Sequence, residues 1–172
     1  SGASCTFPAD FLFVAAMNPC PCGYYPNTDR CTCTEKDIRG YYNRISQPIL
    51  DRIDLRVDVP AVTFTELKAK KDREVSSAML REKVAAAFEI QRERYKEHAF
   101  CFNAELPPAF VEKYCVMSKD AGDLLKSVYE KQYMSARGYH RVLKLARTIA
   151  DIEGACEIND EHVSEALCFK VK

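Results

Sequence analysis

Five segments between residues 75 and 172 each combine a residue that starts helices with apolar residues at helical spacing, and this pattern limits the possible folds most strongly. The starting residues are Ser76 or Ser77, Pro107 and Pro108, Ser118, Ser135, and Asn159. Serine and asparagine accept hydrogen bonds from free N–H groups at a helix N-terminus, and proline fits the first helical turn. Gly154, just beyond the fourth segment, is a residue type that ends helices. The sequence therefore predicts an all-α bundle over residues 75–172.

The apolar positions of these segments predict the core of the bundle. They recur every three or four residues, so that they lie on one face of each helix. The side chains expected to point inward are Leu80, Val84, Ala87, Phe88, Gln91 and Tyr95, then Phe110, Val111 and Tyr114, then Ala121, Leu124, Leu125 and Val128, then Tyr139, Val142, Leu143, Ala146 and Ile149, and finally Val163, Ala166 and Leu167.

The first third of the chain has a different pattern, which predicts strands. Phe11–Met17 is almost continuously apolar, as in strands covered on both faces, and Leu55–Val59 alternates apolar and polar side chains. Between them lie a loop rich in Cys and Pro and a helix-like stretch, Ile38–Asp51, which Pro48 should shorten or bend. Two strands alone do not make a stable sheet. We expect the partner strands to come from another copy of the chain or, as the favoured alternative, from a longer protein of which this chain is a part. The predicted fold class is thus an α/β remnant followed by an all-α bundle.

The composition limits the class of protein. Lys plus Arg equals Asp plus Glu, at 25 each, so bulk charge does not indicate a nucleic-acid binder, and such a role requires a local basic patch. No apolar run approaches the roughly 18 residues of a membrane helix, and the opening Ser-Gly-Ala-Ser does not resemble a signal peptide. We expect a cytoplasmic protein with no membrane partner, divided into residues 1–62, a linker at 63–74 and the helical domain at 75–172.

Nine cysteines are present, and an odd number argues against a secreted disulfide framework. Cys20 and Cys22 form one C-x-C pair, and Cys31 and Cys33 form a second pair after eight intervening residues. Four thiolates in two close pairs can complete a tetrahedral structural zinc site and hold a loop that has little core of its own. Free thiols and disulfides are the alternatives. The remaining cysteines are expected to be small buried hydrophobes: Cys5, Cys101, Cys115, Cys156 and Cys168.

Three further polar side chains are candidates for binding a ligand. Asn18 directly follows the apolar run, although Asn-Pro is also a common start of a turn. Arg52 precedes the second predicted strand, where it belongs either to a surface ion-pair cluster or to a site that reaches a phosphate on a neighbouring molecule. Arg137 lies in the first turn of the fourth predicted helix, where a positive charge is unfavourable unless an anion binds nearby. A solvated basic face that includes Arg141 is the alternative for Arg137.

Three stretches together resemble one protein family. FLFVAAMNPCPCGYY, YYNRISQPILDRIDLRVDVP and SARGYHRVLKLARTIADI are similar, in this order, to the C-terminal part of the magnesium-chelatase-like AAA+ ATPases, specifically the YifB/ComM group. The DRIDL block is shared with related helicases and chelatase subunits, whereas the Cys-rich loop and the SARGYHR helix are more specific to the group. The resemblance spans nearly the whole chain.

The resemblance implies roles for the matching residues. Asn18 resembles the sensor-1 residue that orients water near the γ-phosphate of ATP, Arg52 matches the arginine finger that acts on ATP of the adjacent subunit, and Arg137 matches the sensor-2 arginine of the helical lid. The sequence departs from the family pattern because it has no G-x-x-x-x-G-K-[ST] phosphate loop and no acidic strand end that could hold Mg²⁺. We therefore expect ATP and Mg²⁺ to serve the full-length protein, and this chain alone to be inactive as an ATPase.

Three functions are consistent with these features. The resemblance implies an ATP-driven motor that assembles with copies of itself in a ring, expected to be a hexamer, and acts on DNA, for example in branch migration. A ring is expected because an arginine finger acts across a subunit interface. The first alternative is a chelatase-like ATPase that remodels a protein client. The second is a zinc-stabilised binding module without ATPase activity.

Overall fold

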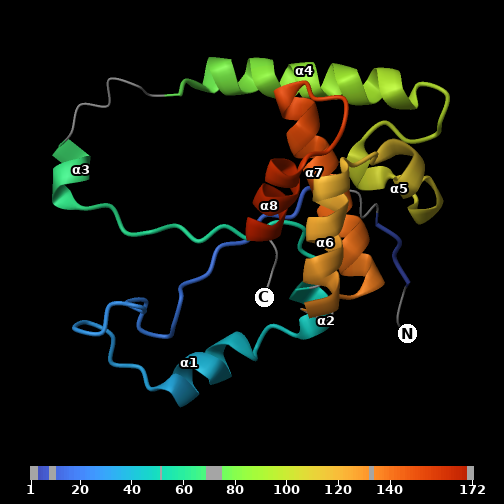
Figure 1. Ribbon diagram of the computed structural model, residues 1–172. Helices are drawn as coiled ribbons and strands as arrows, with labels where there is room; N and C mark the ends of the chain where they lie inside the picture. Colours follow the sequence, from blue (N-terminus) through green and yellow to red (C-terminus); the bar gives the residue numbers. More distant parts are fainter. Residues whose placement is uncertain (1–3, 8–10, 51, 69–74, 132–133, 170–172) are drawn as a thin grey trace. The chain divides into compact units, whose positions relative to one another are not determined.

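The computed structural model describes residues 4–7, 11–50, 52–68, 75–131 and 134–169. Within these ranges the regular structure is helical (Figure 1), apart from one isolated parallel β-bridge between Met117 and Ile158. The elements are α1 (Glu35–Tyr42), α2 (Gln47–Leu50), α3 (Phe64–Lys68), α4 (Ser77–Tyr95), a short 3₁₀ helix η1 (Asn103–Glu105), α5 (Pro108–Tyr114), α6 (Lys119–Lys131), α7 (Ala136–Glu153) and α8 (Asp160–Cys168). The chain divides into two compact units, Ser1–Ile49 and Leu50–Lys172.

The helices of the second unit begin at the predicted capping residues. The side-chain oxygen of Ser76 accepts a hydrogen bond from the backbone N–H of Met79, and that of Ser135 accepts one from Gly138. Ser118 and Asn159 cap α6 and α8 in the same way. Each bond satisfies one of the N–H groups that a helix leaves free at its start. The five predicted helices are therefore confirmed among the described residues, as α4 to α8.

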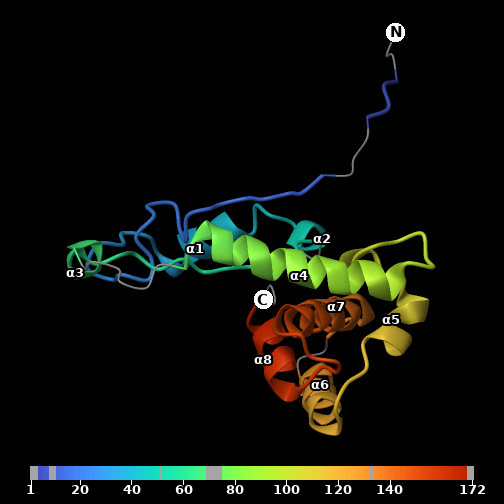
Figure 2. The ribbon, with the colours of Figure 1, turned by 90° about the horizontal axis from the view of Figure 1, so that it is seen from above.

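Helix α7 is the centre of the second unit. It packs against α4, α5, α8 and η1, while α6 packs against α8 (Figures 1 and 2). Its buried face contributes Val142, Leu143, Ala146, Ile149 and Ala150 to the core. The helix ends at Gly154, whose φ of 72° is a left-handed conformation that a residue with a side chain rarely adopts.

A buried polar network fixes α4 against α7. The carboxylate of Asp151, which is fully buried, accepts hydrogen bonds from Arg94 on α4 and from Arg147 one turn earlier on α7. Asn103 of η1 also donates to Asp151, and its backbone N–H donates to Gln91. Among the described residues, no buried side-chain nitrogen or oxygen lacks a hydrogen-bond partner. Buried charges are tolerated when they are paired in this way.

The prediction of strands at Phe11–Met17 and Leu55–Val59 was wrong. Neither segment is a strand, and their large apolar side chains are exposed, with Leu12 at 90% and Val59 at 86%. A strand exists only through ladder hydrogen bonds to a neighbour, and no second strand lies among the described residues to supply them. The helix-like stretch Ile38–Asp51 is also two separate helices, α1 and α2, and Asp51 lies outside the described residues.

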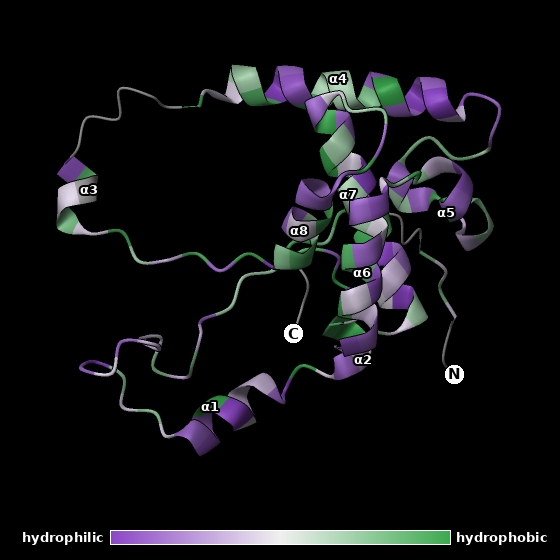
Figure 3. Ribbon diagram, in the orientation of Figure 1, coloured by the Kyte–Doolittle hydropathy of each residue, from purple (hydrophilic) through white to green (hydrophobic). Residues whose placement is uncertain are grey.

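The predicted core was wrong for part of α4. Leu80, Val84 and Phe88 are about half exposed, whereas Ala87, Gln91 and Tyr95 are buried as predicted. Figure 3 shows hydrophobic residues along the whole of α4. Only the second half lies against η1 and the C-terminal part of α7, because the contacts to Asn103 and Asp151 are made there.

The prediction for the five cysteines outside the Cys-rich loop was correct for one of them. Cys115 is buried, whereas the other four are exposed: Cys5, Cys101, Cys156 and Cys168. Their apolar neighbours in the sequence did not place them in the core. Within the described ranges, no helix is long and apolar enough to cross a membrane.

Candidate functional site

The four cysteines of the first unit come together around one point. Their sulfur atoms all lie within 4.8 Å of one another. A tight turn brings the first pair into place: the N–H of Gly23 donates to the carbonyl of Cys20 at 3.0 Å, and Gly23 has a φ of 83°, which favours glycine. The second pair stands directly before α1, whose N-cap is Thr34.

The spacing of the sulfur atoms fits a tetrahedral metal site. Cys20 Sγ lies 3.3 Å from Cys22 Sγ and 3.8 Å from Cys31 Sγ, and Cys22 and Cys31 are 3.6 Å apart. A tetrahedron with Zn–S bonds of about 2.3 Å has edges of about 3.8 Å. The backbone N–H of Tyr25 also donates to Cys20 Sγ at 3.4 Å. Such N–H···S bonds orient metal-binding thiolates.

The thiols influence each other's ionisation. The backbone N–H of Tyr24 stabilises the thiolate of Cys22 and lowers its pKa to about 6. The backbone N–H of Cys22 lowers the pKa of Cys33, but burial and the neighbouring thiols outweigh it and raise that pKa to about 12. Negative charges this close repel one another. A cation at the site would favour the thiolate form of all four sulfurs.

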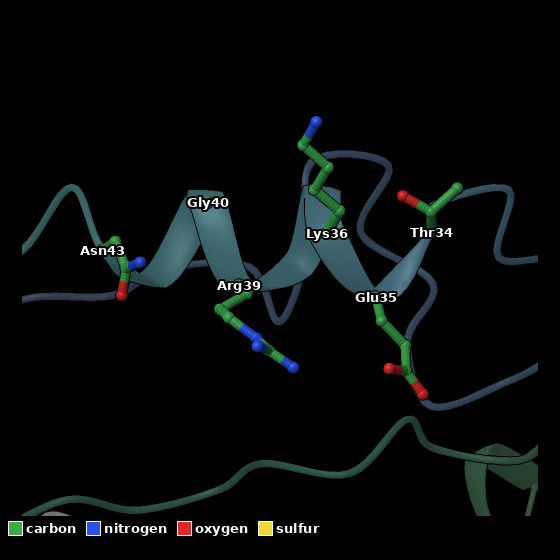
Figure 4. A pocket seen from close by; sticks show the side chains of 6 residues that line it. All are labelled: Thr34, Glu35, Lys36, Arg39, Gly40 and Asn43. Carbon is green, nitrogen blue, oxygen red and sulfur yellow. The ribbon is translucent and has the colours of Figure 1, made fainter.

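Helix α1 follows the cysteine cluster and has a capping box. Asp37 accepts a hydrogen bond from the N–H of Thr34 at 2.9 Å, and Thr34 accepts one from the N–H of Asp37 at 3.2 Å. The bonds from Thr34 hold the pKa of Asp37 below its usual value. A shallow hollow runs along this helix beside Glu35, Lys36 and Arg39. Lys36 points away from Glu35 and Arg39, so these charged groups do not converge on a ligand (Figure 4).

Asn18 lies beside the turn of the first cysteine pair. A Cβ atom on Gly23 would be 3.6 Å from Nδ2 of Asn18. The residue is exposed, and it follows Phe11–Met17, which is also exposed. Asn18 belongs to the first unit, whereas Arg52 and Arg137 belong to the second.

Arg52 lies in an irregular segment after α2. The residue that follows it, Ile53, is hydrogen-bonded to helix α7. Arg52 itself is exposed. Nη1 of Arg141 donates a hydrogen bond of 2.9 Å to the carbonyl oxygen of Ile53. The charge of Asp54 acts on Lys144 of α7: burial lowers the pKa of Lys144, and Asp54 opposes that shift. The two residues that follow Arg52 therefore lie near α7.

Arg137 lies in the first turn of α7, directly after the Ser135 cap. It is exposed, and Arg141 follows one turn later on the same helix. The contact of Arg141 with Ile53 was not predicted, and no local pattern could have revealed it, because 88 positions separate the two residues. Arg147 has a structural role. It is buried, and its Nη1 donates to the carbonyl of Cys156 at 2.9 Å, beyond the end of α7.

Comparisons with known proteins show the family of this chain. Residues 1–67 match the family model described as magnesium chelatase, subunit ChlI, and residues 74–170 match the model of the C-terminal part of that subunit. Competence protein ComM of Haemophilus influenzae is 41% identical over 170 residues, which cover 99% of this chain and 32% of the relative.

Two proteins named YifB are similar over nearly the same range. The YifB protein of Salmonella typhimurium is 40% identical and that of Escherichia coli is 37% identical, each over 98% of this chain and 32% of the relative. The chain thus spans about a third of the length of these curated relatives. On the strength of both family models and these relatives, the chain belongs to the ComM/YifB-type, magnesium-chelatase-like family.

Proposed function

We propose that this chain is part of a cytoplasmic AAA+ ATPase whose complete form is a ring-shaped, ATP-driven motor that remodels DNA. The observation that carries the proposal is the 41% identity, over 99% of the chain, to a protein named for competence. In this proposal residues 1–62 form the C-terminal part of the ATPase core, and residues 75–172 form the helical lid. Residues 63–74 link the core to the lid. The ring is proposed to be a hexamer.

The proposed mechanism gives one task to each of three residues. Asn18 orients the attacking water, Arg52 stabilises negative charge on the phosphates of ATP in the adjacent subunit, and Arg137 binds the phosphates of ATP in its own subunit. When bound to the full-length protein, ATP would supply the phosphoryl group and Mg²⁺ the divalent charge. Phosphoryl transfer depends mainly on positioning and on cations near the developing charge. In support, both arginines are exposed, and a cation in the first turn of α7 is best explained by a bound anion.

We also propose that the cysteine cluster holds one structural zinc ion. Cys20, Cys22, Cys31 and Cys33 offer four sulfur ligands at tetrahedral spacing. Zinc would supply the positive charge that four close thiolates require. Four protein ligands leave no position for water, so the ion would stabilise the loop after Asn18 and take no part in hydrolysis.

A second candidate is an ATPase that remodels a protein client. Both matching family models carry the name of a magnesium chelatase subunit, and the chain has equal numbers of basic and acidic residues. A protein that neutralises many DNA phosphates is usually more basic. The two candidates differ in what stimulates ATP turnover.

The test is ATP hydrolysis by the full-length protein, with and without branched DNA, at two salt concentrations. Stimulation by DNA that decreases at higher salt supports the DNA motor, because phosphate contacts release counterions. Turnover that does not respond to DNA supports the protein-remodelling candidate. The absence of turnover under every condition contradicts both.

A further inference from the structure

We infer that Arg141 is a positioning residue that links the Arg137 end of helix α7 to the segment carrying Arg52. This inference rests on the proposed function, in which Arg137 contacts ATP of its own subunit and Arg52 contacts ATP of the neighbouring subunit. Arg141 itself contacts neither nucleotide. Its task is to hold Arg52 in a place that depends on the position of α7.

The first observation is the hydrogen bond from Arg141 to the backbone. Nη1 of Arg141 lies 2.9 Å from the carbonyl oxygen of Ile53, the residue directly after Arg52. The arginine is half-buried and its donor is charged, which makes this bond stronger than one between neutral groups. Because it is made to the backbone, it fixes the course of the chain at the residue next to Arg52.

The second observation is that the same segment is held at neighbouring points. The N–H of Ile53 donates to the carbonyl of Leu50 at 3.1 Å, and the N–H of Arg56 donates to the carbonyl of Phe169 at 3.1 Å. Asp54 lies close enough to Lys144 of α7 to influence its pKa. Residues 53–56 form no helix or strand of their own, so these contacts with α7 and the end of α8 determine their position.

The third observation is the rigidity of the connection between Arg137 and Arg141. The two residues are four positions apart, which is about one turn or 6 Å along α7. The helix is capped by Ser135 at its start and by Gly154 at its end, and its second half is anchored in the core through Arg147 and Asp151. Arg137 and Arg141 therefore keep a fixed spacing on α7, and the bond to the Ile53 carbonyl places the chain next to Arg52 relative to that end of the helix.

The experiment measures steady-state ATP hydrolysis by full-length protein carrying Arg141→Ala, Arg141→Lys, Arg52→Ala or the double change Arg52→Ala/Arg141→Ala. Arg92→Ala is the control, because Arg92 forms an exposed ion pair with Glu89 on α4. Arg141→Ala is expected to lower kcat by roughly tenfold to a hundredfold, the scale of a misplaced catalytic group, with KM nearly unchanged. Lysine keeps a charged donor of sufficient length, as Lys144 on α7 shows by donating to the carbonyl of Ala104, so Arg141→Lys is expected to restore most of the activity.

The double change separates positioning from general stability. If Arg141 acts through Arg52, removing it from a protein that already lacks Arg52 has no further effect on kcat. A purely structural role would lower kcat by the same factor in both backgrounds. Equal factors, a parent-like Arg141→Ala protein, or failure of lysine to restore activity would each overturn the inference.

A second measurement does not depend on ATP turnover. Amide hydrogen exchange in the full-length protein reports on the N–H groups of Ile53 and Arg56, both of which are hydrogen-bonded. Arg141→Ala is expected to accelerate their exchange, whereas Arg92→Ala leaves it unchanged. If the parent protein has no ATPase activity, the proposed function fails, and exchange still decides whether Arg141 holds this segment. Unchanged exchange in Arg141→Ala contradicts the contact itself.

Discussion

Asp151 accepts a hydrogen bond from Arg94 Nη1 at 2.8 Å although 57 positions separate the two residues. The carboxylate is fully buried and the arginine side chain is 19% exposed. Arg147 donates to the same carboxylate. This shared carboxylate joins α4 to α7, and α7 is the helix that carries Arg137 and Arg141.

Neutralising Asp151 is expected to destabilise the second unit strongly. Asp151→Asn keeps the size of the side chain but leaves two guanidinium groups without their buried countercharge, at a cost of about 3–5 kcal/mol. Unfolding by denaturant, followed by far-UV circular dichroism, measures the free energy. Glu89→Gln is the control, because its exposed pair with Arg92 contributes about 1 kcal/mol or less. Equal effects of the two changes would show that the buried network contributes no more than a surface pair.

A buried and an exposed leucine of the bundle are expected to differ in their response to truncation. Leu125 is 1% exposed and Leu80 is 52% exposed. Leu125→Ala should lower the free energy of unfolding by about 2–5 kcal/mol, because it leaves a cavity in the core. Leu80→Ala should cost about 1 kcal/mol or less, because this half of α4 has little packing to lose. A large loss for Leu80→Ala in this chain would contradict the exposed position of the side chain.

The stability of the second unit is expected to fall at high pH through Cys115. Burial raises the pKa of this thiol from 9.0 to about 11, outweighing the opposing charges of Arg147 and Arg94. As the pH rises, the unfolded chain therefore loses this proton before the folded chain does. The contribution is complete below pH 9 and is lost between about pH 9 and pH 11, amounting to about 3 kcal/mol.

The matched variant for this prediction is Cys115→Ala. Tyrosines and lysines also titrate in the same range, so the quantity to compare is the difference in unfolding free energy between parent and variant at each pH. That difference should shrink as the pH increases from 9 to 11. A constant difference would show that the thiol is as easily ionised in the folded protein as in the unfolded chain.

Zinc is expected to be bound at one ion per chain and to be lost when a ligand is removed. Cys22→Ser should abolish binding and lower the melting temperature, because the loop would lose the ion that holds it. Elemental analysis and thermal unfolding measure both effects. Cys156→Ser is the control, since that cysteine is exposed and lies outside the cluster. Metal-free parent protein with the same melting temperature as Cys22→Ser would contradict the zinc proposal.

Local features of the structure could be predicted from the sequence because their causes are local. Ser135 and Asn159 cap their helices through hydrogen bonds to N–H groups three residues away. The cysteine pairs are brought together by a short loop whose spacing is visible in the sequence. In each case the residues that interact are close along the chain.

Features that depend on distant partners could not be predicted in this way. Leu80 and Gln91 belong to the same helical pattern, yet only Gln91 is buried, because η1 covers that end of α4. Phe11–Met17 has the composition of a strand, but a strand also needs a neighbour. The contact between Arg141 and Ile53 depends on how α7 is placed in the bundle.

The most direct test of the central claim is Arg52→Ala in the full-length protein, with ATP binding and ATP turnover measured separately. Arg56→Ala is the control, because Arg56 lies four residues later and forms an ion pair with Asp58. If Arg52 is an arginine finger, turnover should fall by roughly a thousandfold or more while ATP binding and the Arg56→Ala protein stay close to the parent. Equal losses of binding and turnover, or unchanged turnover, would contradict the assignment of Arg52 as a catalytic residue.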